Sequence, residues 1–360
     1  MTASPESCAR RVESGEPLGR DEALRLLAEA DRAPWPLWLA ADRVRRHFRG
    51  PSVRLCSIAA AKLGRCGEDC RWCAQSAHWN TGIVSHGLLP AERLVEAAKA
   101  AKAAGARHFG LVTSGGRVSD GEIESLCAAA ARIRAETGLA VCGSFGELTA
   151  DRARRLAQAG LARYHHNIET SARYFPQVCT THGYEDRVRT ARAATEAGME
   201  LCSGALFGMG ETDEDRVDVA LAVRDLGARA VPLNFLHPIP GTPLAGAEPL
   251  PPTKILSIVA IFRLMLPDRV IKMAGGRERN LRDMQCLMFM AGADSCMVGG
   301  YLTISGRPAE DDLRMIRDLG LRPAGPEDDG GQRPSISSCS AVSSPAAGKE
   351  EALCGGGHAP

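Results

Sequence analysis

Three cysteines stand within eight residues of one another, and their side chains suit metal chemistry. Cys66, Cys70 and Cys73 follow a Cys-x3-Cys-x2-Cys spacing in the segment 63–79, which contains no fourth cysteine. Thiolates are soft ligands that bind zinc or iron–sulfur clusters. A closed zinc site needs four ligands, usually supplied as two pairs. Three thiolates therefore predict a 4Fe–4S cluster in which one iron stays open to a substrate or cofactor.

Two other interpretations of these thiols stay open at this point. A zinc knuckle could use His78 as its fourth ligand, although the Cys-x3-Cys pair does not fit a usual zinc turn. Scattered structural cysteines are the second alternative, but inert thiols are normally isolated and buried. The close spacing favours the cluster over both.

The composition narrows the class of protein. The 360 residues include 44 Lys and Arg against 43 Asp and Glu, so nucleic acid is not an expected partner. No run reaches the ~18 apolar residues of a membrane span, and the N-terminus lacks the apolar region of a secretory signal. We therefore expect a cytoplasmic protein with no membrane partner. In a reducing cytosol, grouped thiols among the thirteen cysteines are metal ligands or catalysts rather than disulfides.

Short apolar runs alternate with longer amphipathic stretches from residue 53 onward, and glycine marks many of the joins. The runs predict strands at 53–60, 107–113, 139–145, 162–168, 199–207, 230–236, 269–274 and 294–300. The stretches that follow them predict helices at 92–106, 121–136, 149–160, 184–198, 213–227, 253–266, 278–292 and 310–320. A glycine C-cap that leads into the next strand is the repeated join.

Eight strands, each followed by a helix, predict an α/β fold in which a parallel sheet closes into a (β/α)8 TIM-type barrel. An open doubly wound sheet is the alternative, because periodicity alone does not prove closure. The three-cysteine segment falls in the long loop after the first strand. In a barrel that loop lies on the C-terminal face, where active sites assemble.

The barrel is expected to have two appendages. Residues 1–49 predict an N-terminal helical extension, although the first ~20 are polar and we expect them to be mobile. Residues 50–322 form the barrel, and 323–360 are rich in Gly, Ser and Pro and predict a disordered tail. Two cysteines of the tail, Cys339 and Cys354, are not expected to be ligands. Three more are interpreted as core residues, namely Cys127, Cys286 and Cys296.

The fourth predicted strand carries polar groups at every second position. His165, Asn167 and Glu169 share one face in the segment YHHNIE, and the residues between them share the other. Core strands rarely place three such groups in a row, so this face is a candidate site. A solvent-facing edge is the alternative, which a closed barrel disfavours because its strands have no free edge.

The cysteine spacing after a first barrel strand resembles the radical S-adenosylmethionine (SAM) superfamily, and Trp72 fits the aromatic residue common before the third cysteine. Further sequence motifs resemble those of biotin synthases in particular and lie in order across residues 50–320. They are CGEDCRWCAQSAHWNTG, YHHNIETS, CSGALFGMGET, VPLNFLHPIPGTPL, AGGRE and FMAGADS. Together these motifs make a far more specific match than any one of them alone.

The resemblance implies an enzyme, a sulfurtransferase that inserts sulfur between C6 and C9 of dethiobiotin to make biotin. It implies that the open iron of the 4Fe–4S cluster binds SAM, whose cleavage releases a 5′-deoxyadenosyl radical. A second iron–sulfur cluster then supplies the sulfur, while the protein positions and shields the reactants. The resemblance also implies a homodimer and a reductant such as flavodoxin or ferredoxin.

Individual residues are placed by the same resemblance. Asn167 and Glu169 are expected to hold the SAM ribose, although an aspartate is common where Glu169 stands. Arg187 matches an arginine that contacts the SAM carboxylate, with an ordinary helix-surface charge as its alternative. Asn234 matches a residue at the boundary of cofactor and substrate. Residues 204–211 resemble the glycine-rich segment that contacts adenine, where glycine allows close backbone approach.

The match breaks at the second cluster, which three cysteines and one arginine hold as 2Fe–2S in the common family. Cys142 and Cys202 match two of these cysteines, but Gly110 and Lys272 stand where the third cysteine and the arginine are expected. Two further cysteines resemble those of a variant group of biotin synthases with a larger donor cluster. We therefore expect the ligand set Cys56, Cys142, Cys179 and Cys202. Cys56 and Cys179 as small apolar fillers are the alternative.

Two rival functions stay open. Other radical SAM barrel enzymes, such as those that mature hydrogenase or rearrange lysine, would share the fold and the SAM cleavage. A non-enzymatic iron–sulfur sensor or carrier would hold a cluster without cleaving SAM. A carrier has no need of eight βα units with a polar row inside, so the composition of the barrel favours an enzyme.

Overall fold

The chain is described by a computed structural model that covers residues 3–304, 306–325 and 328. In these residues a parallel sheet closes on itself. Its strands are β1 (Ser52–Lys62), β2 (His108–Thr113), β3 (Ala140–Ser144), β4 (Arg163–His165), β5 (Glu200–Cys202), β6 (Ala205–Phe207), β7 (Ala230–Phe235), β8 (Val270–Met273), β9 (Ser295–Met297) and β10 (Arg322–Pro323).

Strand pairing closes the barrel. The hydrogen-bonded order runs β1-β2-β3-β4-β5-β7-β8-β9, and β9 pairs back onto β1, with Arg54 in register with Ser295. All these pairs are parallel, so the carboxyl ends of the strands meet at one face. The TIM-type barrel predicted from the sequence is thereby confirmed, and the open doubly wound sheet is excluded.

The fifth predicted strand is interrupted. Cys202 pairs with Ala230 and Ala205 pairs with Leu233, so β5 and β6 both lie along β7 with a gap between them. Pro232 stands opposite this gap and has no N–H to donate. A Cβ on Gly204 would lie 1.9 Å from the Pro232 carbonyl oxygen, so the chain can pass this point only with glycine.

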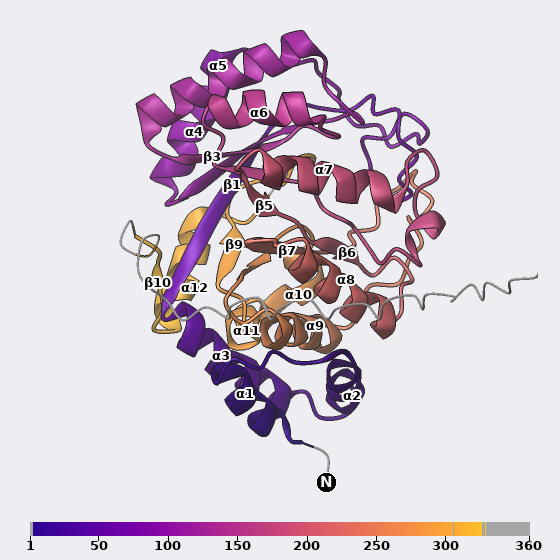
Figure 1. Cartoon of the computed structure of the whole chain (residues 1–360), viewed down its shortest axis with the longest axis vertical. Helices are drawn as coiled ribbons and strands as arrows, with labels where there is room; N and C mark the ends of the chain where they lie inside the picture. The colour runs from indigo at the N-terminus through magenta and orange to yellow at the C-terminus, as the bar shows by residue number, and fades with distance from the viewer. Residues whose placement is uncertain (1–2, 305, 326–327, 329–360) are drawn as a thin grey trace, which may run out of the picture.

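Helices surround the barrel (Figure 1). They are α1 (Pro5–Glu13), α2 (Arg20–Ala30), α3 (Trp35–Arg49), α4 (Ala91–Ala103), α5 (Asp120–Thr137), α6 (Ala150–Gln158), α7 (Tyr184–Glu196), α8 (Asp213–Asp225), α9 (Pro252–Met265), α10 (Arg277–Leu281), α11 (Leu287–Met290) and α12 (Ala309–Asp318), with 3-10 turns at Phe175–Gln177 and Arg282–Met284. The helix expected at 278–292 is broken into short pieces, because Arg282 adopts a φ of 51° that a helix does not allow.

Local signals in the sequence fix the helix ends. Ser119 begins α5 with a capping box, in which its hydroxyl accepts from the Glu122 N–H and the Glu122 carboxylate accepts from the Ser119 N–H. Thr212 and Asp215 form the same box at α8. Gly138 ends α5 in the left-handed conformation that glycine tolerates.

The N-terminal helices pack on the barrel rather than standing apart. In Figure 1, α1, α2 and α3 lie along the lower edge of the view, beside α9. The buried Trp38 indole donates to the Ser257 hydroxyl at 3.2 Å, which joins α3 to α9. For the described residues of this segment, the expectation that the first ~20 are mobile is wrong, because α1 buries Cys8, Ala9 and Val12 on one face.

A buried carboxylate ties the extension to the sheet. Asp294, which directly precedes β9, is fully buried and accepts from Arg49 Nε at 2.8 Å and Arg263 Nη2 at 2.6 Å. Its Oδ1 also accepts from the Ile271 backbone N–H at 2.8 Å. Burial alone would raise the pKa of Asp294, but the charges of Arg49 and Arg263 outweigh it and lower the pKa to about 2.

The C-terminal boundary lies slightly beyond the expected one. Pro323 belongs to β10, which pairs with the start of β1, and the Ala324 N–H donates to the Val53 carbonyl. Most of the tail predicted at 323–360, with Cys339 and Cys354, lies outside the described residues. Among the residues the structure describes, no helix combines the length and apolar character needed to cross a bilayer.

Candidate active site

The three-cysteine loop follows β1 and stands at the carboxyl end of the barrel. Backbone hydrogen bonds close it, since Cys66 N–H donates to Gln75 O and Ala77 N–H donates to Cys66 O. Gly64 starts the loop at a φ of 76°, and a Cβ there would lie 2.7 Å from the Ser85 Cβ. The loop brings all three thiols to one cavity, as the sequence predicts; they are Cys66, Cys70 and Cys73. Burial raises the pKa of the Cys73 thiol to about 11.

This cluster-loop cavity contains polar atoms that lack partners. Among the described residues, Thr113 Oγ1, His166 Nε2 and Arg187 Nε are buried without a hydrogen bond, and all three residues line the cavity. Burial holds the pKa of His166 well below its ordinary value, so its ring is neutral. Buried polar groups are normally satisfied. These three atoms therefore indicate a place for a polar ligand beside the thiols.

Arg187 is held by contacts with residues of the polar row and with Phe175. From α7, its Nη1 donates to the Asn167 carbonyl at 3.0 Å and lies 3.7 Å from Glu169 Oε1. Its guanidinium carbon lies 5.7 Å from the centre of the Phe175 ring. The alternative of an ordinary helix-surface charge is excluded, because the side chain is only 13% exposed.

The polar row at the end of β4 faces the inside of the barrel. His165, Asn167 and Glu169 all line one cavity there, whereas Tyr164 and Ile168 are fully buried in the core and His166 lines the cluster-loop cavity. The three side chains therefore share one cavity as expected, although β4 itself ends at His165. Asn167 Oδ1 accepts from the Gly204 N–H at 3.2 Å, and its amide donates to Glu169 Oε2 at 3.3 Å.

Asn234, on β7, stands between this interior cavity and a third cavity nearer the loops. Its amide donates to the Ala205 carbonyl at 3.1 Å, and its Oδ1 accepts from the Gly275 N–H at 2.9 Å and the Tyr301 hydroxyl at 3.2 Å. Trp72 and Tyr301 line the same two cavities. No periodicity in the sequence indicates Tyr301, because it lies in an irregular segment after β9.

A second group of thiols lies deeper in the interior cavity. Cys56, Cys142 and Cys202 line it together with Lys272. The Lys272 ammonium is 3.7 Å from Cys56 Sγ and 3.8 Å from Cys202 Sγ. Burial would lower the pKa of Lys272, but these thiols outweigh it and raise the pKa above its ordinary value. Burial also raises the pKa of Cys142, to about 12.

The close approach of Ile58 explains why β2 carries a glycine where a cysteine was expected. Gly110 pairs with Ile58 on one side and with Cys142 on the other. A Cβ on Gly110 would lie 3.0 Å from Ile58 Cγ2, so the isoleucine occupies the space that a cysteine side chain would need. Arg163, in register with Cys142, adds a second cation to the cavity wall.

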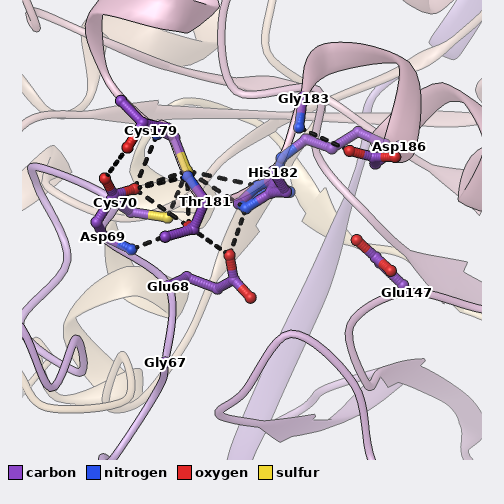
Figure 2. Close-up of polar contacts among 12 residues, drawn as sticks. Gly67, Glu68, Asp69, Cys70, Glu147, Cys179, Thr181, His182, Gly183 and Asp186 are labelled. Carbon is purple, nitrogen blue, oxygen red and sulfur yellow. Dashed lines mark hydrogen bonds and ion pairs between the residues drawn. The ribbon is translucent and has the colours of Figure 1, made fainter.

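Cys179 lies elsewhere, in the loop after β4. It does not line the interior cavity among the described residues, and its Sγ is 3.8 Å from Cys70 Sγ and 3.3 Å from His182 Nδ1 (Figure 2). The hydrogen bond from Cys70 and the nearby His182 lower the pKa of Cys179 to about 4, while the same bond raises the pKa of Cys70. This arrangement gives no support to Cys179 as a ligand beside Cys56, Cys142 and Cys202.

The zinc-knuckle alternative finds no support either. His78 is exposed, and its Nε2 lies 3.0 Å from the Gly67 carbonyl rather than beside the three thiols. Cys296 is fully buried, as expected of a core residue, while Cys127 and Cys286 are half-buried at the edge of the core.

Comparison with known protein families gives two matches. Residues 62–223 match the Radical SAM superfamily, and residues 232–322 match the Biotin and Thiamin Synthesis associated domain. Both matches fall within the barrel. The first covers the part with the cluster loop, and the second covers the part with Asn234 and Lys272.

Whole-chain relatives agree with these matches. The chain is 50% identical to a biotin synthase of Geobacter sulfurreducens over 89% of its length and 98% of the relative. It is 49% identical to a biotin synthase of Heliobacterium modesticaldum over 88% of its length and 98% of the relative. Among solved structures, methylornithine synthase aligns with a TM-score of 0.78 at 22% identity, over 89% of this chain and 98% of that one. This last likeness speaks for the fold alone.

Proposed function

The chain belongs to the biotin synthase family, and from that premise we propose that it is a radical SAM sulfurtransferase that converts dethiobiotin to biotin. Sulfur inserted between C6 and C9 replaces one C–H bond at each carbon by a C–S bond. Each new bond therefore needs its own hydrogen abstraction. The observation that carries the proposal is the presence of two separate groups of three cysteines on adjoining cavities at the mouth and in the interior of one barrel.

The donor set of the cluster-loop cavity fits the first cluster. Three thiols with no fourth cysteine in the loop leave one iron of a 4Fe–4S cluster without a protein ligand. When bound there, such a cluster supplies the electron that cleaves SAM to a 5′-deoxyadenosyl radical. The unpartnered atoms of Thr113, His166 and Arg187 supply polar contacts for a ligand bound at the open iron.

The polar row at β4 fits the SAM nucleoside. By this proposal, the Glu169 carboxylate and the Asn167 amide hold the ribose hydroxyls, and Arg187 pairs with the carboxylate of the methionine part. Glu169 has a φ of 65°, which is strained for a residue with a side chain and turns its carboxylate toward Arg187. Asn234 and Trp72 line both neighbouring cavities and so separate SAM from the substrate.

The interior cavity fits a second iron–sulfur cluster as the sulfur donor. Cys56, Cys142 and Cys202 supply three thiolates, and burial of three negative charges requires compensation. The buried Lys272 and the partly buried Arg163 provide two cations in the same wall. Lys272 is an ammonium with no free lone pair, so it compensates charge where the common family has an arginine ligand. Three thiolates leave room for either a 2Fe–2S or a larger cluster.

The proposal is tested by a single-turnover assay. The chain is reconstituted anaerobically with iron and sulfide, then mixed with dethiobiotin, SAM and a reduced flavodoxin or ferredoxin. Biotin, methionine and 5′-deoxyadenosine are expected, with two molecules of 5′-deoxyadenosine per biotin by the bond count above. SAM cleavage without biotin would point to another radical SAM enzyme, such as a hydrogenase-maturation or lysine-rearranging one. If SAM is not cleaved at all, the result would favour a non-enzymatic iron–sulfur carrier.

Three further features belong to the proposal and rest on family membership. The reductant is a flavodoxin or ferredoxin, the protein is a homodimer, and it acts in the cytoplasm. Residues 1–49 serve as an extension of the barrel at 50–322. Size-exclusion chromatography with light scattering on the reconstituted chain tests the dimer, and a monomer at all concentrations would contradict it.

A further inference from the structure

Two irregular loops bring three metal-binding side chains together beside the cluster-loop cavity. Cys70 comes from the cluster loop, and Cys179 and His182 come from the loop after β4 (Figure 2). One ligand atom from each of the three lies within 4.8 Å of the other two. Cys70 and Cys179 are buried, and the His182 side chain is 10% exposed. Cys70 and His182 also line the cavity, so an ion can reach them.

The separations match those of one tetrahedral ion. Two thiolates bound at ~2.3 Å with a tetrahedral angle between them lie about 3.8 Å apart, and a thiolate and an imidazole nitrogen lie about 3.6 Å apart. Cys70 Sγ and Cys179 Sγ are 3.8 Å apart, and Cys179 Sγ is 3.8 Å from His182 Nε2. Two of the three separations therefore fit a single ion, and the third, between Cys70 and His182, is within 4.8 Å.

The surroundings orient the imidazole for this task. Glu68 Oε2 lies 2.7 Å from His182 Nδ1, so it accepts the proton of that nitrogen and leaves the Nε2 lone pair free. Thr181 holds the same carboxylate oxygen through its hydroxyl at 2.5 Å. A carboxylate behind a histidine is the arrangement that fixes the tautomer in metal sites.

We propose that Cys70, Cys179 and His182 form a mononuclear site for Fe²⁺ in the chain that has not yet received its cluster. Two thiolates and one imidazole suit Fe²⁺ as well as Zn²⁺ and leave one tetrahedral position for water. Because Cys70 belongs to both sites, the ion and the assembled 4Fe–4S cluster exclude each other. The site therefore holds a first iron beside the loop that receives the cluster. Its existence does not depend on the reaction proposed above; only the second role of Cys70 does.

The test uses Co²⁺ as a probe in the full chain, prepared anaerobically without iron or sulfide. Thiolate-to-cobalt charge-transfer and ligand-field bands report tetrahedral coordination with sulfur. Wild type is expected to bind one Co²⁺ more per chain than Cys179→Ser or Cys70→Ser. A large excess of Fe²⁺ is expected to weaken these bands in wild type by competition, because Fe²⁺ binds such donors less tightly than Co²⁺. Cobalt that binds to the interior thiols gives the same background in every variant, so only the difference counts.

Two matched variants separate this site from the cluster loop itself. Cys66→Ser and Cys73→Ser remove cluster-loop thiols that are not part of the proposed ion site. Both variants are expected to keep the cobalt bands that Cys179→Ser loses. Glu68→Gln is expected to keep the spectrum but weaken cobalt affinity 10- to 100-fold, as the loss of a partner behind a metal-bound histidine does. Circular dichroism checks that each variant is folded.

One pattern of results would overturn the proposal whatever the outcome of the biotin assay. If cobalt binding survives Cys179→Ser and is lost in Cys66→Ser and Cys73→Ser, the ion is held by the loop thiols alone. Folded Cys179→Ser and His182→Asn variants with wild-type affinity and spectrum would have the same meaning.

Discussion

The ammonium of Lys272 lies 3.7 Å from the thiol of Cys56, inside the barrel and away from solvent. The two residues come from β8 and β1, which β9 separates in the sheet. A buried ammonium is costly unless anions surround it. Cys202, 3.8 Å from the same nitrogen, supplies a second partner, and these thiols raise the pKa of Lys272, so the lysine keeps its charge.

Replacement of Lys272 by Met is expected to lower the iron and sulfide content of the interior cluster by more than half. The three thiolates then lose their nearest cation, and Arg163 alone compensates them. SAM cleavage is expected to persist, because the cluster loop lies in a different cavity. Iron and sulfide per chain, with Mössbauer spectra of the anaerobic protein, measure the effect.

Two variants control for the loss of the lysine. Lys272→Arg keeps the charge and is expected to retain most of the iron. Lys99→Met removes an exposed lysine on α4 and is expected to change nothing. A Lys272→Met protein with full iron, full sulfide and normal biotin yield would show that the ammonium has no part in holding the cluster.

Cys56 and Cys179 are expected to behave differently in fully reconstituted protein. Cys56→Ser removes a thiol of the interior cavity and should reduce the second cluster and abolish biotin formation while SAM is still cleaved. Cys179→Ser should leave the interior iron unchanged, because its thiol lies beside Cys70. The opposite pattern would return Cys179 to the ligand set expected from the sequence.

The sequence predicted the barrel and the polar row because both are periodic. Alternating apolar and amphipathic runs determine the order of strands and helices, and period-two alternation in the segment that begins with β4 indicates which side chains face inward. Tyr164 and Ile168 are buried in the core, while Asn167 and Glu169 line the interior cavity. Each of these features depends on neighbours in sequence.

The contacts that periodicity does not determine were missed. Cys70 and Cys179 are 109 positions apart, and their approach depends on the backbone paths of two irregular loops. Tyr301 reaches Asn234 from another such segment. The helix α1 was missed for a different reason, since its apolar face is only Cys8, Ala9 and Val12 within a polar stretch. Packing on α3 and α9, not propensity, stabilises so short a helix.

Glu169→Gln is expected to raise the dissociation constant of SAM about tenfold or more. The carboxylate provides charge-assisted hydrogen bonds to the ribose hydroxyls, each worth about 1.5–3 kcal/mol, and an amide provides weaker ones. Anaerobic equilibrium dialysis with reconstituted protein measures the binding. Glu196→Gln, on the exposed side of α7, is the matched control. Equal affinity in both variants would remove Glu169 from the SAM site.

Asp294→Asn is expected to lower the free energy of unfolding by about 3–5 kcal/mol. The change leaves the guanidinium groups of Arg49 and Arg263 buried without their anion, which is the costly way to break a buried ion pair. Urea unfolding of the cluster-free chain, followed by circular dichroism, measures the loss. Asp151→Asn, at a position 70% exposed, should cost less than about 0.5 kcal/mol. Similar midpoints for the two variants would contradict the importance of this network.

The same carboxylate predicts how stability depends on pH. The folded pKa of Asp294 is about 2, below the ~3.9 of an unfolded aspartate, so the unfolded chain binds the proton more readily. Its contribution of about 2–3 kcal/mol is therefore complete above about pH 5 and is lost as the pH falls from there toward 2. The difference in unfolding free energy between wild type and Asp294→Asn should shrink over that interval and stay constant from pH 5 to 8. Urea midpoints at closely spaced pH values test this, and a difference that stays constant down to pH 2 would show that Asp294 does not titrate with folding.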